Sequence, residues 1–245
     1  MTLLIARMTL RDLMGQRRML VMVALAIIPL AVANVFRLGG HEEVRIEFAA
    51  KALLEGLVTT GVLPVIGAVI GTSALGTEFE NMTAIYLLSK PVSRAAIAAG
   101  KLLAAGVAVV VLVVPLAAAA GWVALGDPGT GRIVVGFAIA LTAGSLAYTA
   151  VFLALSIVTG RALIIGMGYA FLWEGAITSL FAGTRVLSIR QYTLGLADAL
   201  TNVAPSDFNA QLSGPAAIAG LVIACVGGFA VATWRLARWE ARESP

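Results

Sequence analysis

Six stretches of predominantly apolar residues follow one another along the chain, separated by shorter polar segments. They cover about residues 19–36, 57–75, 102–125, 133–158, 162–181 and 215–234. Since a helix of roughly 20 apolar residues crosses a bilayer, each stretch is long enough to span a membrane. Runs such as residues 107–114 do not alternate between apolar and polar positions, as the strands of a transmembrane barrel would. The pattern predicts an all-α polytopic membrane protein with six transmembrane helices in a single membrane domain, residues 1–245.

The segments outside these stretches differ in character. In residues 1–18, helical spacing places Arg7, Arg11 and Arg18 on one arc and apolar residues such as Leu10 toward the other side. This predicts an amphipathic interfacial helix, which serves either as a positively charged anchor or as a docking surface for a partner. Residues 37–56 carry charges without a periodic pattern and are expected to form a solvated outer loop. Residues 182–213 are half apolar but too short to span, so we expect outer interfacial helices there.

Composition narrows the class of protein further. Hydrophobic residues make up 60% of the chain and charged residues 12%, against roughly 45–50% and about 25% in soluble globular proteins. These values exclude an ordinary soluble enzyme, a disordered tail and a disulfide-stapled secreted domain. The single cysteine, Cys225, cannot form an intrachain disulfide, and the single histidine, His41, cannot build a histidine metal site alone.

The distribution of charge predicts the orientation in the membrane. With the N-terminus in the cytoplasm, the inner segments hold eleven basic and five acidic residues, a net charge of +6. The outer segments hold six basic and seven acidic residues, a net charge of −1. Because cytoplasmic segments are enriched in Lys and Arg, both termini are predicted to be cytoplasmic. A cleaved signal peptide over the first stretch is the alternative, but 18 residues precede the apolar run and five further stretches follow it.

The segment between the second and third stretches, residues 76–100, carries the most specific pattern. Glu78 and Glu80 suit a helix N-terminus, where the macrodipole favours negative charge. An apolar face follows at Met82, Ile85 and Tyr86. Pro91 is expected to stop this helix, and Ser93-Arg94 to begin another that runs through Gly100-Lys101 into the third span. The segment is either a cytoplasmic helix that receives a movement from a partner or a plain connecting loop.

The residue order Gly-Thr-Glu-x-Glu … Leu-Leu-Ser-Lys-Pro-Val-Ser-Arg … Gly-Lys in this segment resembles the ATP-binding-cassette type-2 permeases, the membrane halves of many bacterial export systems. The resemblance implies a permease subunit of an ABC exporter in the bacterial cytoplasmic membrane. It also implies that residues 76–100 form a coupling segment, in which the following side chains meet an ATPase subunit: Glu78, Glu80, Met82, Ile85, Tyr86 and Arg94. The implied partners are that ATPase, a second permease chain (identical or different) and the lipid bilayer, with no nucleic acid.

The chain itself lacks a phosphate-binding loop of the form Gly-x-x-x-x-Gly-Lys-Ser/Thr. Gly100-Lys101 is followed by Leu102, and Ala95 stands where the first glycine would be. The chain is therefore not expected to be an enzyme or to bind a cofactor. ATP and Mg²⁺ are expected on the partner subunit.

Inside the predicted spans, Glu174 is the one ionisable residue well away from an end. Because an unpaired carboxylate in hydrocarbon is costly, Glu174 is expected to be protonated, hydrogen-bonded or exposed to a wet cavity. It is either a pathway or gating residue or a structural hydrogen-bonding group. The small-residue patterns Gly67-x-x-x-Gly71 and Gly220-x-x-x-Ala224-x-x-x-Gly228 permit close helix packing, either within the chain or, for the first, at a dimer or pathway surface.

Two other functional classes fit less well. An intramembrane enzyme needs clustered acids or Ser–His pairs at membrane depth, and the spans contain none. A secondary carrier or channel not coupled to ATP usually shows an internal repeat or a ring of polar residues, and neither is detectable. This carrier or channel is kept as the alternative.

Overall fold

The structure is a computed structural model that describes residues 6–10, 17–40, 44–80, 93–180, 182–201, 203–204 and 206–238. All regular elements within these residues are helical. The helices are α2 (Arg17–Leu38), α3 (Arg45–Glu47), the π-helix η1 (Phe48–Val62), α4 (Leu63–Glu80), α6 (Arg94–Leu125), the 3-10 helix η2 (Pro128–Thr130), α7 (Gly131–Val158), α8 (Ala162–Gly168), the π-helix η3 (Tyr169–Ile177), α9 (Thr178–Leu180), the 3-10 helix η4 (Ala182–Leu187), α10 (Ile189–Thr201) and α11 (Gly214–Ala237).

Five helices of the described chain are long and apolar enough to cross a membrane. They are Arg18–Leu38, Arg45–Gly76, Arg94–Leu125, Gly131–Val158 and Gly214–Ala237. The prediction of a helical polytopic membrane protein is therefore confirmed. The remaining predicted stretch, 162–181, is helical from Ala162 to Leu180, but its apolar part Ala162–Ile177 is shorter than the other five.

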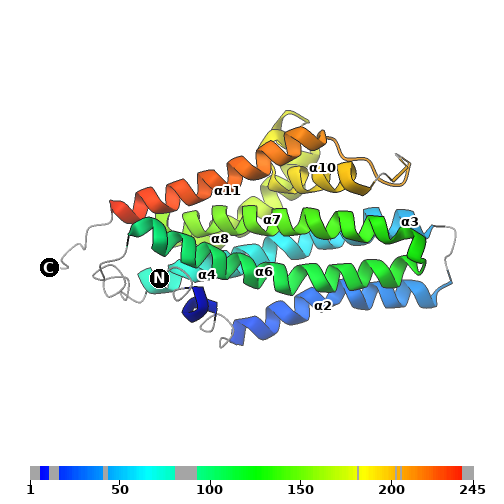
Figure 1. Cartoon of the computed structure of the whole chain (residues 1–245), viewed down its shortest axis with the longest axis horizontal. Coiled ribbons are helices and arrows are strands. Elements are labelled where there is room, and N and C mark those ends of the chain that lie inside the picture. Colours follow the sequence, from blue (N-terminus) through cyan, green and yellow to red (C-terminus); the bar gives the residue numbers. More distant parts are fainter. Residues whose placement is uncertain are drawn as a thin grey trace.

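The long helices form an elongated bundle with two distinct ends (Figure 1). The proximal end is where α2 begins and α11 finishes, and the distal end is the opposite one. Near the distal end, Arg37 in the last turn of α2 donates from Nη1 to the Val123 carbonyl of α6 at 3.3 Å. Gly121 of α6 also packs on Val134 of α7 there. Thus α2 and α6 run from the proximal to the distal end, and α7 runs back.

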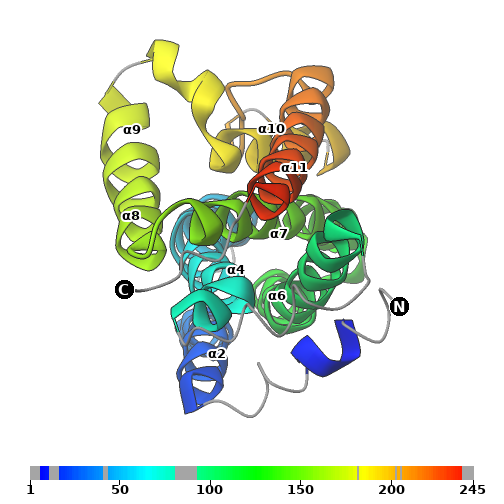
Figure 2. The same cartoon turned by 90° about the vertical axis from the view of Figure 1, so that its left-hand side faces the viewer.

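Helix α7 is the central element, with α4, α6, α10 and α11 packed around it (Figure 2). Its large side chains Phe137, Tyr148 and Phe152 are fully buried. Glycines allow the neighbouring backbones to come close: a Cβ on Gly71 of α4 would lie 3.0 Å from the Phe152 Cβ, and one on Gly228 of α11 would lie 2.6 Å from the Ala150 carbonyl group.

Both small-residue patterns are used for packing within the chain. A Cβ on Gly67 would lie 3.1 Å from the Tyr148 Cβ, and one on Gly220 would collide with the Tyr192 ring. Ala224 packs against the same core. The glycines of the first pattern thus face α7, so packing within the chain explains this pattern and no dimer contact is needed.

The predicted solvated loop 37–56 is wrong over most of its length, because an unbroken helical run begins at Arg45 and continues to Glu80. Between Phe48 and Val62 this run is a π-helix, and the Thr59 hydroxyl accordingly donates to the Leu54 carbonyl five residues earlier, at 2.7 Å. Its charged residues find partners: Lys51 Nζ lies 3.3 Å from Glu47 Oε1 and donates to the Ser206 carbonyl at 2.6 Å. Contacts with distant parts of the chain therefore support helix where local sequence shows only unpatterned charge.

The predicted leader and outer helices are described in part. Residues 6–10 are helical, with Arg7 exposed and Thr9 buried, while residues 1–5 and 11–16 lie outside the described residues. Residues 182–213 contain two short helices, η4 and α10, as their composition indicated. Helix α10 packs against α7 and α11 and buries Gln191, Thr193 and Leu194.

Candidate functional site

Glu174, the intramembrane acid, lies in the π-helix η3 with only 1% of its surface exposed. The helix carries it to the middle of α7, where Tyr148 faces it with its ring fully buried. Next to η3, the chain turns through Ser188 into α10, so residues from three separate segments meet at one carboxyl group. A buried acid must be matched by hydrogen-bond donors, and this meeting point supplies them.

Four donors converge on the two Glu174 carboxyl oxygens. The Tyr148 hydroxyl donates to Oε2. The Ser188 hydroxyl and the Arg190 backbone N–H each donate to Oε1 at 3.1 Å, and the Tyr169 hydroxyl lies 3.1 Å from Oε1 while its one proton also faces the Leu187 carbonyl at 2.9 Å. Both carboxyl oxygens therefore have hydrogen-bond partners within the described residues. The prediction that Glu174 is hydrogen-bonded is confirmed.

Arg190 extends this network to a fourth segment of the chain. Its Nη1 donates to the Glu174 backbone carbonyl at 3.1 Å, and its Nη2 lies 3.9 Å from Glu55 Oε1 in η1. The Arg190 side chain is 16% exposed and the Glu55 side chain 29%, so the ion pair is largely removed from solvent. We call Glu55, Tyr148, Tyr169, Glu174, Ser188 and Arg190 the Glu174 network. It joins η1, η3, α7 and the start of α10.

A polar cavity of about 210 Å³ lies beside the Glu174 network. It is lined by Glu55, Arg190, Thr178, Gln191 and neighbouring polar groups from residues 185 and 209–211. At roughly 30 Å³ per water molecule, this volume accommodates several waters or one small polar molecule. Glu174 does not line this cavity, because its carboxyl group is enclosed by its own donors. The arrangement is that of a fixed internal hydrogen-bonding centre next to a polar chamber.

The predicted coupling residues occupy a different part of the molecule, at the proximal end. Glu78 and Glu80 lie in the last turn of α4, and their side chains are outside the described residues, as are Met82, Ile85 and Tyr86 altogether. The prediction that a helix begins at Glu78 is wrong: no proline interrupts residues 76–80, so α4 continues through both acids.

Arg94 is placed as predicted, at the first position of a helix that continues into the third span. Ser93 caps this helix, since its Oγ accepts a hydrogen bond from the Ala96 N–H at 3.3 Å. Helix α6 then runs without interruption from Arg94 to Leu125. Arg94 and Glu174 do not share a site, because α6 begins at the proximal end and Glu174 faces the middle of α7.

Sequence reasoning identified Glu174 but none of its partners. Glu55 and Arg190 entered it only as outer charges, and Tyr148 was one polar group within a long apolar stretch. A tyrosine at mid-span was a usable signal, because its hydroxyl needs a partner when buried. Which residue meets Tyr148 depends on the packing of η3 against α7, and no local pattern encodes it.

Comparison with protein families gives one match that covers almost the whole chain. The model of the family described as ABC-2 family transporter protein matches residues 3–241. A search of curated proteins found no match to the chain.

Proposed function

Since this chain belongs to the ABC-2 family of transporter proteins, as a membrane component without an ATPase domain, we propose that it is the permease subunit of an ATP-driven exporter. The observation that carries the proposal is the family match over residues 3–241, which includes every described long helix. The energy comes from the hydrolysis of ATP, which binds together with Mg²⁺ on a separate ATPase subunit. Two permease chains, identical or different, combine with that ATPase in the bacterial cytoplasmic membrane.

Six membrane crossings, with both termini in the cytoplasm, fit the directions of the helices. Arg161 at the start of α8 lines a cavity together with Arg18 of α2, which places it at the proximal end. Helix α11 starts at the distal end, since a Cβ on Gly214 would meet Ala199 of α10, and the adjacent Leu200 carbonyl accepts from Arg132 at the start of α7. The chain must therefore return to the distal end between residues 161 and 214.

The helical run α8–η3–α9 supports this return. Its parts contain 7, 9 and 3 residues, and 19 helical residues extend at most about 28 Å, close to the roughly 30 Å of a hydrocarbon core. With this crossing counted, the +6 end is cytoplasmic and the −1 end is external.

Single-cysteine labelling tests this topology. In a Cys225→Ala background, we expect Asp127→Cys in the distal turn to react with a membrane-impermeant maleimide on intact cells. We expect Ser89→Cys to react only after permeabilisation. Reaction of Ser89→Cys from outside would overturn both the orientation and the cytoplasmic position of residues 76–100.

We further propose that residues 76–100 transmit ATP-driven movement from the ATPase to the spans. Helix α4 ends at Glu80 and α6 begins at Arg94, and both of these helix ends lie at the proximal end. A displacement of the segment between them would therefore act directly on two long helices packed against α7. Met82, Ile85 and Tyr86 supply an apolar surface for the partner, with Glu78, Glu80 and Arg94 as charged contacts beside it.

The test is co-purification of the ATPase subunit with the variant Ile85→Ala/Tyr86→Ala. We expect the recovered ATPase to fall and transport to fall with it, while insertion of the chain stays normal. The matched control is Val186→Ala/Leu187→Ala, because this adjacent apolar pair is 59% and 66% exposed and lies in η4, before α10. Normal recovery and normal transport in the first variant would mean that the segment is a connector only.

A catalytically inactive ATPase subunit separates this function from the alternative. An ATP-driven permease loses transport when its ATPase cannot hydrolyse ATP, whereas a secondary carrier or channel continues to transport. Whether the chain is an ATP-driven permease or a carrier, we assign Glu174 a structural role, because it is only 1% exposed and is enclosed by hydrogen-bond donors.

A further inference from the structure

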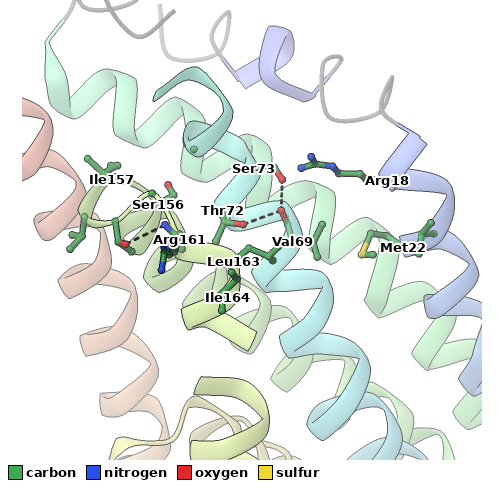
Figure 3. Close-up of a pocket in the computed structure, with 16 residues that line it drawn as sticks. Arg18, Met22, Val69, Thr72, Ser73, Ser156, Ile157, Arg161, Leu163 and Ile164 are labelled. Atoms are coloured by element: carbon green, nitrogen blue, oxygen red, sulfur yellow. Dashed lines mark hydrogen bonds between the residues drawn. The ribbon is translucent and has the colours of Figure 1, made fainter. Parts of the chain in front are cut away.

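A cavity of about 640 Å³ opens at the proximal end between the start of α2, the end of α4 and the turn from α7 to α8 (Figure 3). Its volume lies within the roughly 300–1,000 Å³ of small-molecule binding sites. None of the residues of the Glu174 network lines it, and neither does Arg94, the one predicted coupling residue whose side chain is described. Gly76, at the start of segment 76–100, does line it. The cavity is therefore a separate feature that calls for its own explanation.

Two arginines on different helices give the cavity a positive charge. Arg18 approaches it from α2, directed toward Ser73 of α4, and Arg161 lies on the other side at the start of α8 (Figure 3). None of the described residues that line it is acidic. Among the residues that the structure describes, none forms a hydrogen bond or ion pair with either guanidinium. The side chains of Glu78 and Glu80, further along α4, lie outside the described residues.

The hydroxyl groups between the two arginines are already engaged. Thr72 donates to the Ala68 carbonyl at 2.6 Å, and Ser73 donates to the Val69 carbonyl at 2.6 Å. An anion in the cavity would therefore be held mainly by the two guanidinium groups. A guanidinium offers paired donors that match the oxygens of a phosphate.

Apart from Ser156 and Thr159 at the turn from α7 to α8, the rest of the lining is apolar, and part of it is exposed on the outside of the bundle. Val21, Leu163 and Ile164 are 61%, 40% and 71% exposed, whereas Met22 is buried. A charged entrance above an apolar, laterally exposed wall fits a molecule with an anionic head and a hydrocarbon tail. A free inorganic anion would leave this wall unused.

We propose that this cavity binds an anionic phospholipid from the adjacent leaflet, with its phosphate between Arg18 and Arg161 and an acyl chain along Val21, Met22, Leu163 and Ile164. Basic pockets between transmembrane helices on the cytoplasmic side are suited to anionic lipid headgroups. The assignment of that leaflet rests on the proposed topology, while the binding itself does not require the ATPase.

Arginines are also common at cytoplasmic helix ends because they set the orientation of a protein in the membrane. The binding experiment therefore needs a control variant that removes the same charge elsewhere at this end. Arg235 and Arg238 provide it, because they lie at the same end on α11 and its C-terminal cap and do not line the cavity. Their guanidinium carbons lie 5.3 and 4.3 Å from the centre of the Trp234 ring.

The experiment measures lipid binding by the purified full-length chain, using native mass spectrometry and thermal unfolding with phosphatidylglycerol or phosphatidylcholine. We expect the wild type to retain phosphatidylglycerol and to unfold at a higher temperature with it. Arg18→Gln/Arg161→Gln should weaken this binding by at least about tenfold, since charge-assisted hydrogen bonds are the strong ones. Arg18→Lys/Arg161→Lys should restore part of it, and Arg235→Gln/Arg238→Gln should leave it within about twofold.

Three results would overturn the proposal. An equal loss in the Arg235→Gln/Arg238→Gln variant would mean that only the surface charge attracts the lipid. Equal destabilisation of Arg18→Gln/Arg161→Gln in both lipids would mean that the arginines pair with the chain itself, for example with Glu78 or Glu80. Displacement of the lipid by millimolar inorganic phosphate or glycerol phosphate would assign the site to a soluble phosphate. None of these measurements involves the ATPase, so they are independent of the test of the exporter function.

Discussion

The two ends of the helical bundle use arginine in different ways. Toward the distal end, Arg37, Arg132 and Arg190 donate to backbone carbonyls of other helices or helical segments, at 3.3, 3.2 and 3.1 Å. At the proximal end, Arg18 and Arg161 line an open cavity, and no group within the described residues accepts from them. Arg37, Arg132 and Arg190 thus fasten segments together, whereas Arg18 and Arg161 remain available for a ligand.

This difference bears on how the molecule would work as a permease. The Glu174 network holds η3, α7 and the start of α10 together through hydrogen bonds, and it holds η1 through the Arg190–Glu55 ion pair. The proximal part of α4 instead packs on α7 through small residues: a Cβ on Gly76 would lie 3.5 Å from the Ser156 Cβ. We therefore expect the distal half to resist movement and the proximal half, where the ATPase is proposed to bind, to yield to it.

Replacing Glu174 tests the distal half with the largest expected effect. Glu174→Leu leaves the Tyr148 and Ser188 hydroxyls and the Arg190 N–H without their acceptor. With each buried unsatisfied group costing about 1–3 kcal/mol, we expect a loss of at least about 3 kcal/mol. Glu174→Gln retains one acceptor oxygen and should lose about 1–2 kcal/mol. Thermal unfolding in detergent, together with the folded yield, measures both.

Transport by the same two variants sharpens the result. If Glu174 acts only through the fold, transport should follow the amount of folded chain in both variants. Wild-type stability and full transport in Glu174→Leu would remove both the structural and the pathway role.

A matched pair of arginine substitutions compares the two ends directly. Arg190→Gln removes the donor to the Glu174 carbonyl and leaves Glu55 without its charge partner. Breaking such a partly buried pair should cost about 2–4 kcal/mol. Arg161→Gln, at an exposed position, should change stability in phosphatidylcholine by less than about 0.5 kcal/mol. Equal destabilisation by the two substitutions would contradict the contrast between the ends.

Several features of this fold follow directly from the sequence. The apolar runs located the long helices because a membrane span needs a continuous hydrophobic stretch, which is visible in the local sequence. Ser93 and Arg94 marked the start of α6 correctly, because an N-cap acts on its own first turn. Glu174 stood out because an acid within a span is rare.

Other features depend on contacts that local patterns do not encode. Residues 45–56 read as a loop, yet they are helical, with Lys51 paired to Glu47 and bonded to Ser206 and with Glu55 opposite Arg190. The helix end near Glu80 was misplaced because the acids favour a helix start, while the preceding helix simply continues. The proximal cavity joins residues 18 and 161, which only the packing of α2, α4 and α8 brings together.

Replacing Lys51 is expected to change stability least, and it compares an exposed ion pair with the Glu174 network in the distal half. It lies 3.3 Å from Glu47 Oε1 and donates to the Ser206 carbonyl at 2.6 Å, with its side chain 41% exposed. Lys51→Met keeps the length and apolar stem but removes both interactions, and we expect a loss below about 1 kcal/mol. Because the exposed ion pair is screened by salt whereas the bond to the carbonyl is not, raising the salt concentration from 0.05 to about 0.5 M should reduce this loss only in part. A loss that vanishes completely at high salt would show that the ion pair alone stabilises this turn of η1. A loss as large as that of Arg190→Gln would show that distal stability is not concentrated in the Glu174 network.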